Sequence, residues 1–206
     1  MRSFDYEKLA QRKWDSEILS YVAKIHEYKG RQELYIRQKP VELERLVEIA
    51  RVQSTEASNK IEGIVTTNTR IRQLVSDKTA PRNRDEKEIM GYRDVLNTIH
   101  ESHSFIPIRP AYILQLHRDL LKRTGLSYCG SFKNVQNYIN ETRPDGTQVT
   151  RFTPVAPYET PGAVAAICDS YARTLALEVL DPLLLIPTFI CDFLCIHPFN
   201  DGNGRM

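Results

Sequence analysis

The sequence is poor in cysteine, and the cysteines it has are not arranged to bind a metal. Its four cysteines, Cys129, Cys168, Cys191 and Cys195, lack the paired C-x-x-C spacing of a zinc site. Cys191 and Cys195 lie one helical turn apart in an apolar segment. We therefore expect free thiols within the core, and we expect the protein to be cytoplasmic.

An excess of charge and a long apolar run are also missing. The formal net charge of the 206-residue chain is +2, which gives no bulk electrostatic basis for direct binding to nucleic acid or to an acidic membrane. The longest apolar run, Leu183 to Ile196, is too short to span a bilayer and contains Asp192, so it indicates a buried helix. The N-terminal stretch MRSFDYEKLAQRKWDSE is charged from its second residue and lacks the apolar segment of a signal peptide. We expect no membrane association.

Helical periodicity dominates the sequence and predicts an all-α fold. A polar break at residues 80–84 predicts a boundary between an N-terminal helical region, residues 1–84, and a C-terminal core, residues 85–206. The predicted helices of the first region cover residues 6–28 with Gly30 as C-cap, 40–50 after Pro40, about 54–63, and a segment from Thr67 capped by Asn68 or Thr69.

The C-terminal core combines helices with a single β-hairpin. Its predicted helices cover residues 85–101, 108–125, 160–177 and 182–196. Between Gly130 and Pro157 the alternating pattern on both sides of an R-P-D-G turn predicts the hairpin. The charged run RNRDEKE is interpreted as a solvated helix start. His100 and His103 are interpreted as surface residues, and His117 as a histidine on a helix face rather than a ligand.

The stretch HPFNDGNGR near the C-terminus carries the groups of a phosphate site. Gly202 and Gly204 flank Asn203, so the backbone can adopt positive φ and direct successive N–H groups at one anion. Asp201 would repel a phosphate unless a hard cation lies between them, and Mg²⁺ is suited to that place because it takes one carboxylate together with phosphate oxygens. Arg205 supplies donors for a second phosphate.

His197 begins this stretch and is the nearby group that titrates around neutral pH, which makes it the candidate general base. Pro198 stiffens the loop, and Phe199 is interpreted as an apolar anchor that fixes His197 relative to the core. Together these residues predict phosphoryl or nucleotidyl transfer, in which a hydroxyl loses its proton to His197. The loop is not a P-loop, because no Lys-Ser/Thr follows the glycines and no strand precedes them.

The same stretch resembles the signature of the Fic family, His-Pro-Phe-x-Asp/Glu-Gly-Asn-Gly-Arg-x-x-Arg, and matches it at every specified position through Arg205. The resemblance implies a Fic-type helical core with a β-hairpin flap, and transfer of AMP from ATP to a Tyr, Thr or Ser hydroxyl of a protein. It implies that His197 is the catalytic base and that Asp201 binds Mg²⁺. It implies nucleotide binding by Phe199, Asn200, Gly202, Asn203, Gly204 and Arg205.

Two further stretches resemble parts of the same family. The sequence SNKIEG, from Ser58 to Gly63, resembles its inhibitory pattern, Ser/Thr-x-x-x-Glu-Gly/Asn. The resemblance implies that Glu62 reaches the ATP site, pairs with the second signature arginine and blocks placement of the γ-phosphate; the alternative is an exposed glutamate at a helix end. The hairpin resembles the flap that holds a target segment by strand addition, and the alternative is an ordinary surface hairpin.

The sequence stops at Met206, before the second signature arginine and the helix that follows it in the family. We therefore expect weak or no transferase activity from this chain. The alternatives are an inactive nucleotide- or protein-binding module, an enzyme that removes AMP or transfers another nucleotide or phosphocholine, and a phosphotransfer toxin related to the Doc kinases, which the Gly-Asn-Gly cradle disfavours. A homodimer stays open.

Overall fold

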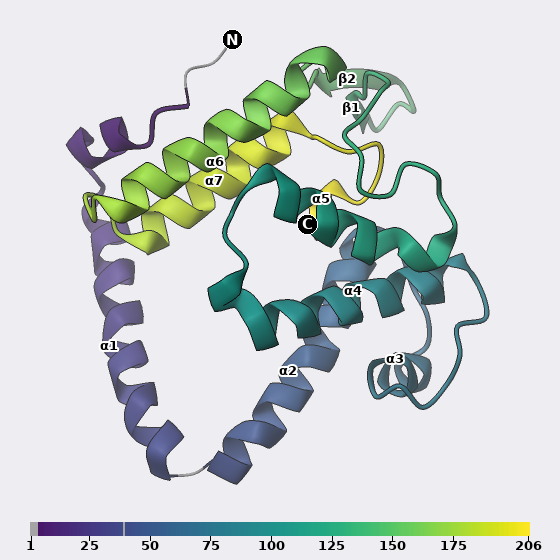
Figure 1. The fold of residues 1–206 in the computed structure, drawn as a ribbon, viewed down its shortest axis with the longest axis horizontal. Helices are drawn as coiled ribbons and strands as arrows, with labels where there is room; N and C mark the ends of the chain where they lie inside the picture. Colours follow the sequence, from purple (N-terminus) through teal and green to yellow (C-terminus); the bar gives the residue numbers. More distant parts are fainter. Residues whose placement is uncertain (1–3, 39) are drawn as a thin grey trace.

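The computed structural model describes residues 4–38 and 40–206 and confirms a helical fold with one small antiparallel sheet. The described residues form seven α-helices, labelled in Figure 1. They are α1 Ser16–Gln38, α2 Pro40–Ile61, α3 Asn68–Val75, α4 Arg84–Ser102, α5 Pro110–Leu121, α6 Thr160–Ala176 and α7 Pro182–Ile196. The strands are β1 Ile139–Thr142 and β2 Gln148–Phe152.

Helices α1 and α2 form a V that extends from the rest of the molecule (Figure 1). The predicted end of the first helix at Gly30 is wrong: residues 7–11 form a separate 3₁₀ turn, and α1 runs from Ser16 to Gln38. A glycine inside a helix costs only about 1 kcal/mol, which does not stop a helix with good formers on both sides. The expected apolar stripe of α1 is also not buried, since Ile18, Leu19 and Ile25 are exposed.

Helix α2 is continuous where the sequence predicts two helices, because no proline or glycine interrupts residues 51–61. It ends as expected beside Gly63, which has a φ of 75° and so takes the left-handed conformation that favours glycine. The predicted caps of α3, Asn68 or Thr69, are wrong by one or two residues. Thr67 is the N-cap, and its side chain accepts the N–H of Arg70.

Helix α4 packs closely on α5 and on the end of α2 and α3. Gly91 permits the contact with α5, since a methyl group on its Cα would lie 1.9 Å from the carbonyl oxygen of Leu120. On the other side of α4, Ile89 and Met90 pack with Ile71 and Leu74 of α3. These contacts cross residues 80–84, and the domain boundary there stays a prediction.

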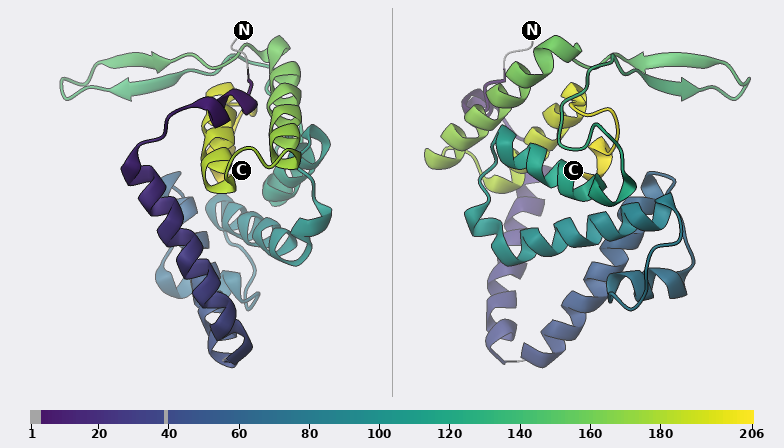
Figure 2. Two further views of the ribbon diagram at one scale, coloured as in Figure 1. Left: turned by 90° about the vertical axis from the view of Figure 1, so that its left-hand side faces the viewer. Right: turned by 45° about the vertical axis from the view of Figure 1, so that its right-hand side comes forward.

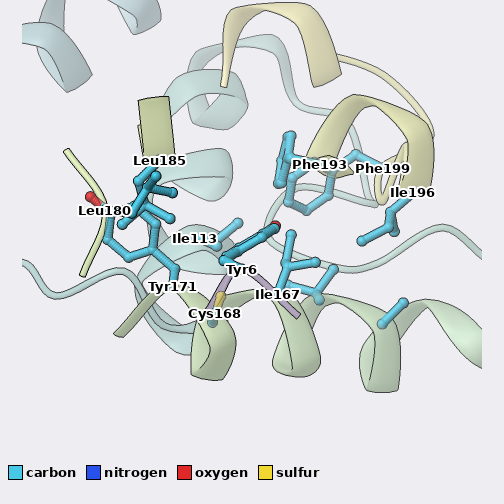
Figure 3. Packing of buried hydrophobic residues seen from close by; sticks show 12 residues of the cluster. Tyr6, Ile113, Ile167, Cys168, Tyr171, Leu180, Leu185, Phe193, Ile196 and Phe199 are labelled. Carbon is cyan, nitrogen blue, oxygen red and sulfur yellow. The ribbon is translucent and has the colours of Figure 1, made fainter. Parts of the chain in front are cut away.

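The main core lies between α5, α6 and α7 (Figure 3). Tyr6 is buried in it, and its N–H donates to Ser170 Oγ at 3.0 Å. The prediction that α7 is buried holds for one face only: Leu185, Phe193 and Ile196 are buried, whereas other apolar residues of α7 are exposed, namely Ile186, Ile190 and Leu194. All four cysteines are free, as expected, but Cys191 is exposed rather than in the core.

The β-hairpin projects away from the helices (Figure 2). Strands β1 and β2 pair antiparallel, with Asn140 opposite Thr150 and Thr142 opposite Gln148, and every residue of both strands is exposed. The predicted hairpin is confirmed, with shorter strands than the sequence pattern indicates. In the part of the chain that the structure describes, no helix has both the length and the apolar character needed to cross a bilayer.

Candidate functional site

The loop that contains the candidate base begins where α7 ends. His197 caps α7 in a left-handed conformation, with φ 51° and ψ 64°, and its N–H donates to the carbonyl oxygen of Phe193 at 2.9 Å. The residue that follows is Pro198, and a residue before proline is disfavoured in the helical conformation. The His-Pro dipeptide therefore ends the helix at the point where the histidine is needed.

Phe199 and Asn203 fold the loop back on itself. The side chain of Asn203 accepts the N–H of Phe199 and donates to the Phe199 carbonyl oxygen, both at 2.8 Å. The Phe199 side chain is fully buried in the main core beside Phe193 (Figure 3), as expected of an apolar anchor. Asn203 is thus fully engaged within the loop, whereas Asn200 is exposed and donates to Asn134 at 3.2 Å.

His117 supports the loop from α5 and was not recognised in the sequence as part of the site. Its Nδ1 accepts the N–H of Gly130 at 3.0 Å, so its Nε2 carries the proton and donates to the carbonyl oxygen of Asp201, also at 3.0 Å. Its ring stacks on Phe199 with 3.7 Å between centroids. Burial lowers the pKa of His117, which favours the neutral form that this pattern requires. His117 lies four residues from both Ile113 and Leu121, which are buried, and this helical spacing could have predicted that His117 is buried as well.

The glycine loop forms a tight turn after Asp201. Gly202 has a φ of 82°, and residues 203–205 form a 3₁₀ turn in which the N–H groups of Arg205 and Met206 both point to the Gly202 carbonyl oxygen at 3.2 Å. The N–H of Gly202 donates to its neighbour, the Asp201 carboxylate, at 2.6 Å. The loop therefore starts a helical turn directly after Asp201, with the N-terminal end of that turn at the cradle.

Glu62 reaches this loop from the end of α2. A methyl group placed on the Cα of Gly204 would lie 1.9 Å from Glu62 Oε1, so the carboxylate occupies the space directly against Gly204. The carbonyl oxygen of Asn59 accepts the N–H groups of Glu62 and Ile64, which fixes the turn that carries Glu62. Of the other residues of the inhibitory pattern, Gly63 forms the left-handed turn and Ser58 is half-buried one turn earlier in α2.

A network of charged side chains from α4 surrounds the loop. Glu88 is buried and accepts hydrogen bonds from Arg205 at 2.5 Å and from Arg84 at 2.6 Å. Arg84 also donates to Asp201 at 2.9 Å. Because Glu86 and Glu88 are both buried, the interpretation of RNRDEKE as a solvated helix start is wrong for these two residues. Their partners are distant in the sequence, so no local pattern predicts the network.

Residues on both sides of Gly204 line one cleft of about 290 Å³, between the end of α2, the start of α4 and the signature loop. Both acidic and basic side chains line it. Those with charge are Glu62, Arg84, Asp85, Glu88, Asp201 and Arg205. The structure therefore brings together Glu62, Asp201 and Arg205, three residues that the sequence analysis singled out.

The segment that leads into the hairpin holds the loop from the opposite side. Lys133 is buried; its main-chain N–H donates to the Pro198 carbonyl oxygen at 2.8 Å and its ammonium to the Ile196 carbonyl oxygen at 3.0 Å. Asn137 donates to the Phe199 carbonyl oxygen at 2.9 Å. Burial lowers the pKa of Lys133 to about 8. Burial, followed by repulsion from Lys133, lowers the pKa of His197.

Asp201 presents a partly exposed carboxylate to the cleft. The described residues contain no group of three side chains that could hold a metal by themselves. Magnesium in nucleotide sites is commonly bound by one or two carboxylates together with substrate phosphates and water. The Asp201 side chain is 35% exposed at the cleft, and its contact with Arg84 involves a guanidinium that is itself exposed and able to move. These residues fit Mg²⁺ carried in with a nucleotide.

Comparisons with a family model and with a curated protein both find similarity to Fic proteins. Residues 107–206 match the model of the Fic/DOC family. A curated protein from Nematostella vectensis, named protein adenylyltransferase Fic, is 25% identical over 170 residues, which cover 79% of this chain and 37% of that protein. The chain thus spans about a third of this relative's length.

Solved structures share the fold. A Fic-domain-containing signalling protein from Bacteroides thetaiotaomicron superposes with a TM-score of 0.70 at 25% identity, over 81% of this chain and 62% of that one. A segment of Fic-1 from C. elegans, with one glutamate replaced by glycine, superposes with a TM-score of 0.66 at 20% identity. The match covers 97% of this chain and 62% of that segment, and at this identity it supports the fold alone.

Proposed function

Because this chain is a member of the Fic/DOC family, whose model it matches over residues 107–206, we propose that it is a protein adenylyltransferase. It moves AMP from ATP to a Tyr, Thr or Ser hydroxyl of a protein. The observation that carries the proposal is the geometry of one loop. His197 stands at its start in a left-handed cap, and the Gly202–Gly204 turn stands at its end with N–H groups of a helical turn at the cradle.

In the proposed reaction the target hydroxyl attacks the α-phosphorus of ATP, and the bond to the departing diphosphate breaks. His197 accepts the hydroxyl proton. Burial favours the neutral imidazole, so the ring is able to take up that proton near neutral pH. The residue suited to hold Mg²⁺ is Asp201, and bound Mg²⁺ would neutralise phosphate charge.

The remaining loop residues bind the phosphates in this proposal. The main chain at Asn203 and Gly204 offers N–H groups at the start of a helical turn, which suits an anion, while the N–H of Gly202 donates to the Asp201 carboxylate. Arg205 is held in place by Glu88, so its guanidinium is oriented before substrate arrives. Phe199 and Asn203 contribute by fixing the loop, since both are buried and engaged within the protein. Asn200 is exposed, with its amide bonded to Asn134, and we assign it a contact with the nucleotide.

We propose further that Glu62 inhibits the enzyme. Its carboxylate lies against Gly204, in the cleft that a phosphate group would enter. A carboxylate and a phosphate cannot share this space, since both are anions and the position is already filled. Two guanidinium groups line the same cleft: that of Arg84 is exposed to an incoming anion, whereas that of Arg205 is buried against Glu88.

The test is AMP transfer by the purified chain. The chain is incubated with ATP labelled at the α-phosphate, Mg²⁺ and a protein mixture, and labelled protein is quantified. We expect little transfer by the wild type, more by Glu62→Gly, and none by the Glu62→Gly, His197→Ala double variant. Glu56→Gln, earlier in α2, serves as the control and should behave as the wild type. Equal silence of all variants, with ATP still bound, would instead support a nucleotide-binding module without transferase activity.

A further inference from the structure

Lys133 touches the main chain on both sides of the candidate base. Its ammonium donates to the carbonyl oxygen of Ile196 and its N–H donates to that of Pro198, at 3.0 and 2.8 Å. These are the residues before and after His197. A single residue, which lies at the start of the segment leading to the hairpin, therefore brackets the histidine.

Burial of the Lys133 ammonium is energetically unfavourable. The residue is 3% exposed, and among the described residues no carboxylate forms an ion pair with it. Burying an unpaired charge is unfavourable, and an apolar side chain of similar length would fill the same volume without that cost. The C-terminal end of α7 offsets part of the cost, because its last carbonyl groups carry partial negative charge. Packing alone therefore does not explain why residue 133 is a lysine.

The conformation of His197 explains what the cation does. A left-handed conformation costs a non-glycine residue about 1–2 kcal/mol and persists only where the surroundings hold it. The bond to the Ile196 carbonyl oxygen fixes the peptide unit before His197, and the bond to the Pro198 carbonyl oxygen fixes the peptide unit after Pro198. Together they restrain the main chain on both sides of His197 and so support the conformation that orients its ring. Asn137 extends the same contact to Phe199.

We propose that Lys133 is the positioning residue for His197. The proposal rests on the proposed function for the role of His197 as base, but the contact itself is measurable without any transfer reaction. Lys133 is also the charged group that acts on the His197 ring; the other influences are burial and a hydrogen bond with the main chain of Leu194, which opposes the effect of burial.

The test is an NMR titration of the His197 ring in the intact chain, with its signals assigned from a His197→Gln variant. In the unmodified chain we expect a low His197 pKa and a second, smaller inflection of the same signals near pH 8, where Lys133 loses its proton. Lys133→Met should raise the His197 pKa and abolish the second inflection, whereas Lys133→Arg should keep the pKa low. Lys122→Met, which removes an exposed lysine, should leave both unchanged.

Transfer activity provides a separate readout in the Glu62→Gly background. Lys133→Met should lower kcat by about 100-fold with little change in the KM for ATP, because a misplaced base affects the chemical step, and Lys133→Arg should restore part of it. If the titration follows expectation while no variant transfers AMP, the contact stands and the proposed function fails. An unchanged His197 pKa in Lys133→Met, together with no inflection near pH 8 in the unmodified chain, overturns the proposal. The inflection near pH 8 is measured in the unmodified chain, so this part of the test can be carried out even if Lys133→Met does not fold.

Discussion

Replacing Glu88 by glutamine should destabilise the protein substantially, although the two side chains have nearly the same shape. The Arg205 and Glu88 side chains are 2% and 3% exposed, so water cannot take the place of the lost charge. The guanidinium of Arg205 keeps one other acidic neighbour, Asp201, at 3.6 Å. Among the described residues its Nε has no hydrogen-bond partner, which leaves little capacity to compensate.

The magnitude follows from this burial. Removing one partner of a buried ion pair costs about 3–5 kcal/mol, and the contact with Asp201 places the expected loss near the lower end, at about 3 kcal/mol. The second guanidinium at Glu88, that of Arg84, adds little because it is exposed, and exposed pairs contribute about 0–1 kcal/mol. With a urea m-value of about 2 kcal/mol per molar, the unfolding midpoint should fall by about 1.5 M.

The assay is urea unfolding, followed by circular dichroism and by the fluorescence of Trp14, the sole tryptophan. Glu101→Gln, at an exposed position of the same helix, serves as the control and should stay within about 0.5 kcal/mol of the wild type. Replacing both Glu88 and Arg205 by methionine should recover at least half of the loss, because no buried charge is then left alone. A loss below about 0.5 kcal/mol in Glu88→Gln would refute the reasoning, since it would mean that the pair is solvated.

Two further predictions concern the packing around the site. Arg70 donates two hydrogen bonds to Glu86 and holds the pKa of Glu86 at about 2, below its ordinary 4.5. The pair therefore stabilises the fold above about pH 4.5, and this contribution is lost as the pH falls toward about 2. Urea midpoints measured across this range should fall more steeply in the wild type than in Glu86→Gln. Gly91→Ala should cost more than about 2 kcal/mol, because its methyl group would collide with the Leu120 carbonyl oxygen. Gly30→Ala, in open space inside α1, should stabilise the fold by about 0.5–1 kcal/mol. Urea unfolding checks both variants, and equal changes in stability for Gly91→Ala and Gly30→Ala would contradict the surroundings described for these two glycines.

Features that depend on neighbouring residues were predictable from the sequence. The turn at His197 follows from the proline after it, the loop shape from its glycines, the start of α5 from Pro110, and the end of the 3₁₀ turn that follows α5 from Gly125. The hairpin follows from two alternating segments around one turn. In each case the residues that determine the structure lie within one or two turns of one another.

Features that depend on distant contacts were not predictable. Glu88 meets Arg205 across 117 residues, and Lys133 meets Ile196 across 63. The sequence pattern places Glu88 in a solvated helix start and Lys133 in the predicted hairpin segment, because nothing nearby indicates the burial of either charge. Helix α1 passes Gly30 because one weak helix former does not overcome its neighbours.

The central claim is that the Glu62 carboxylate fills the place of a nucleotide phosphate beside Gly204. Calorimetric titration of ATP with Mg²⁺ into the wild type and into Glu62→Gly tests it most directly. Relief of one close anionic contact at the cleft is worth about 1.4 kcal/mol or more, so the variant should bind ATP about tenfold more tightly or better. Glu62→Gln, which keeps the size and loses the charge, should lie between the two. Equal affinity of the wild type and Glu62→Gly would contradict the account.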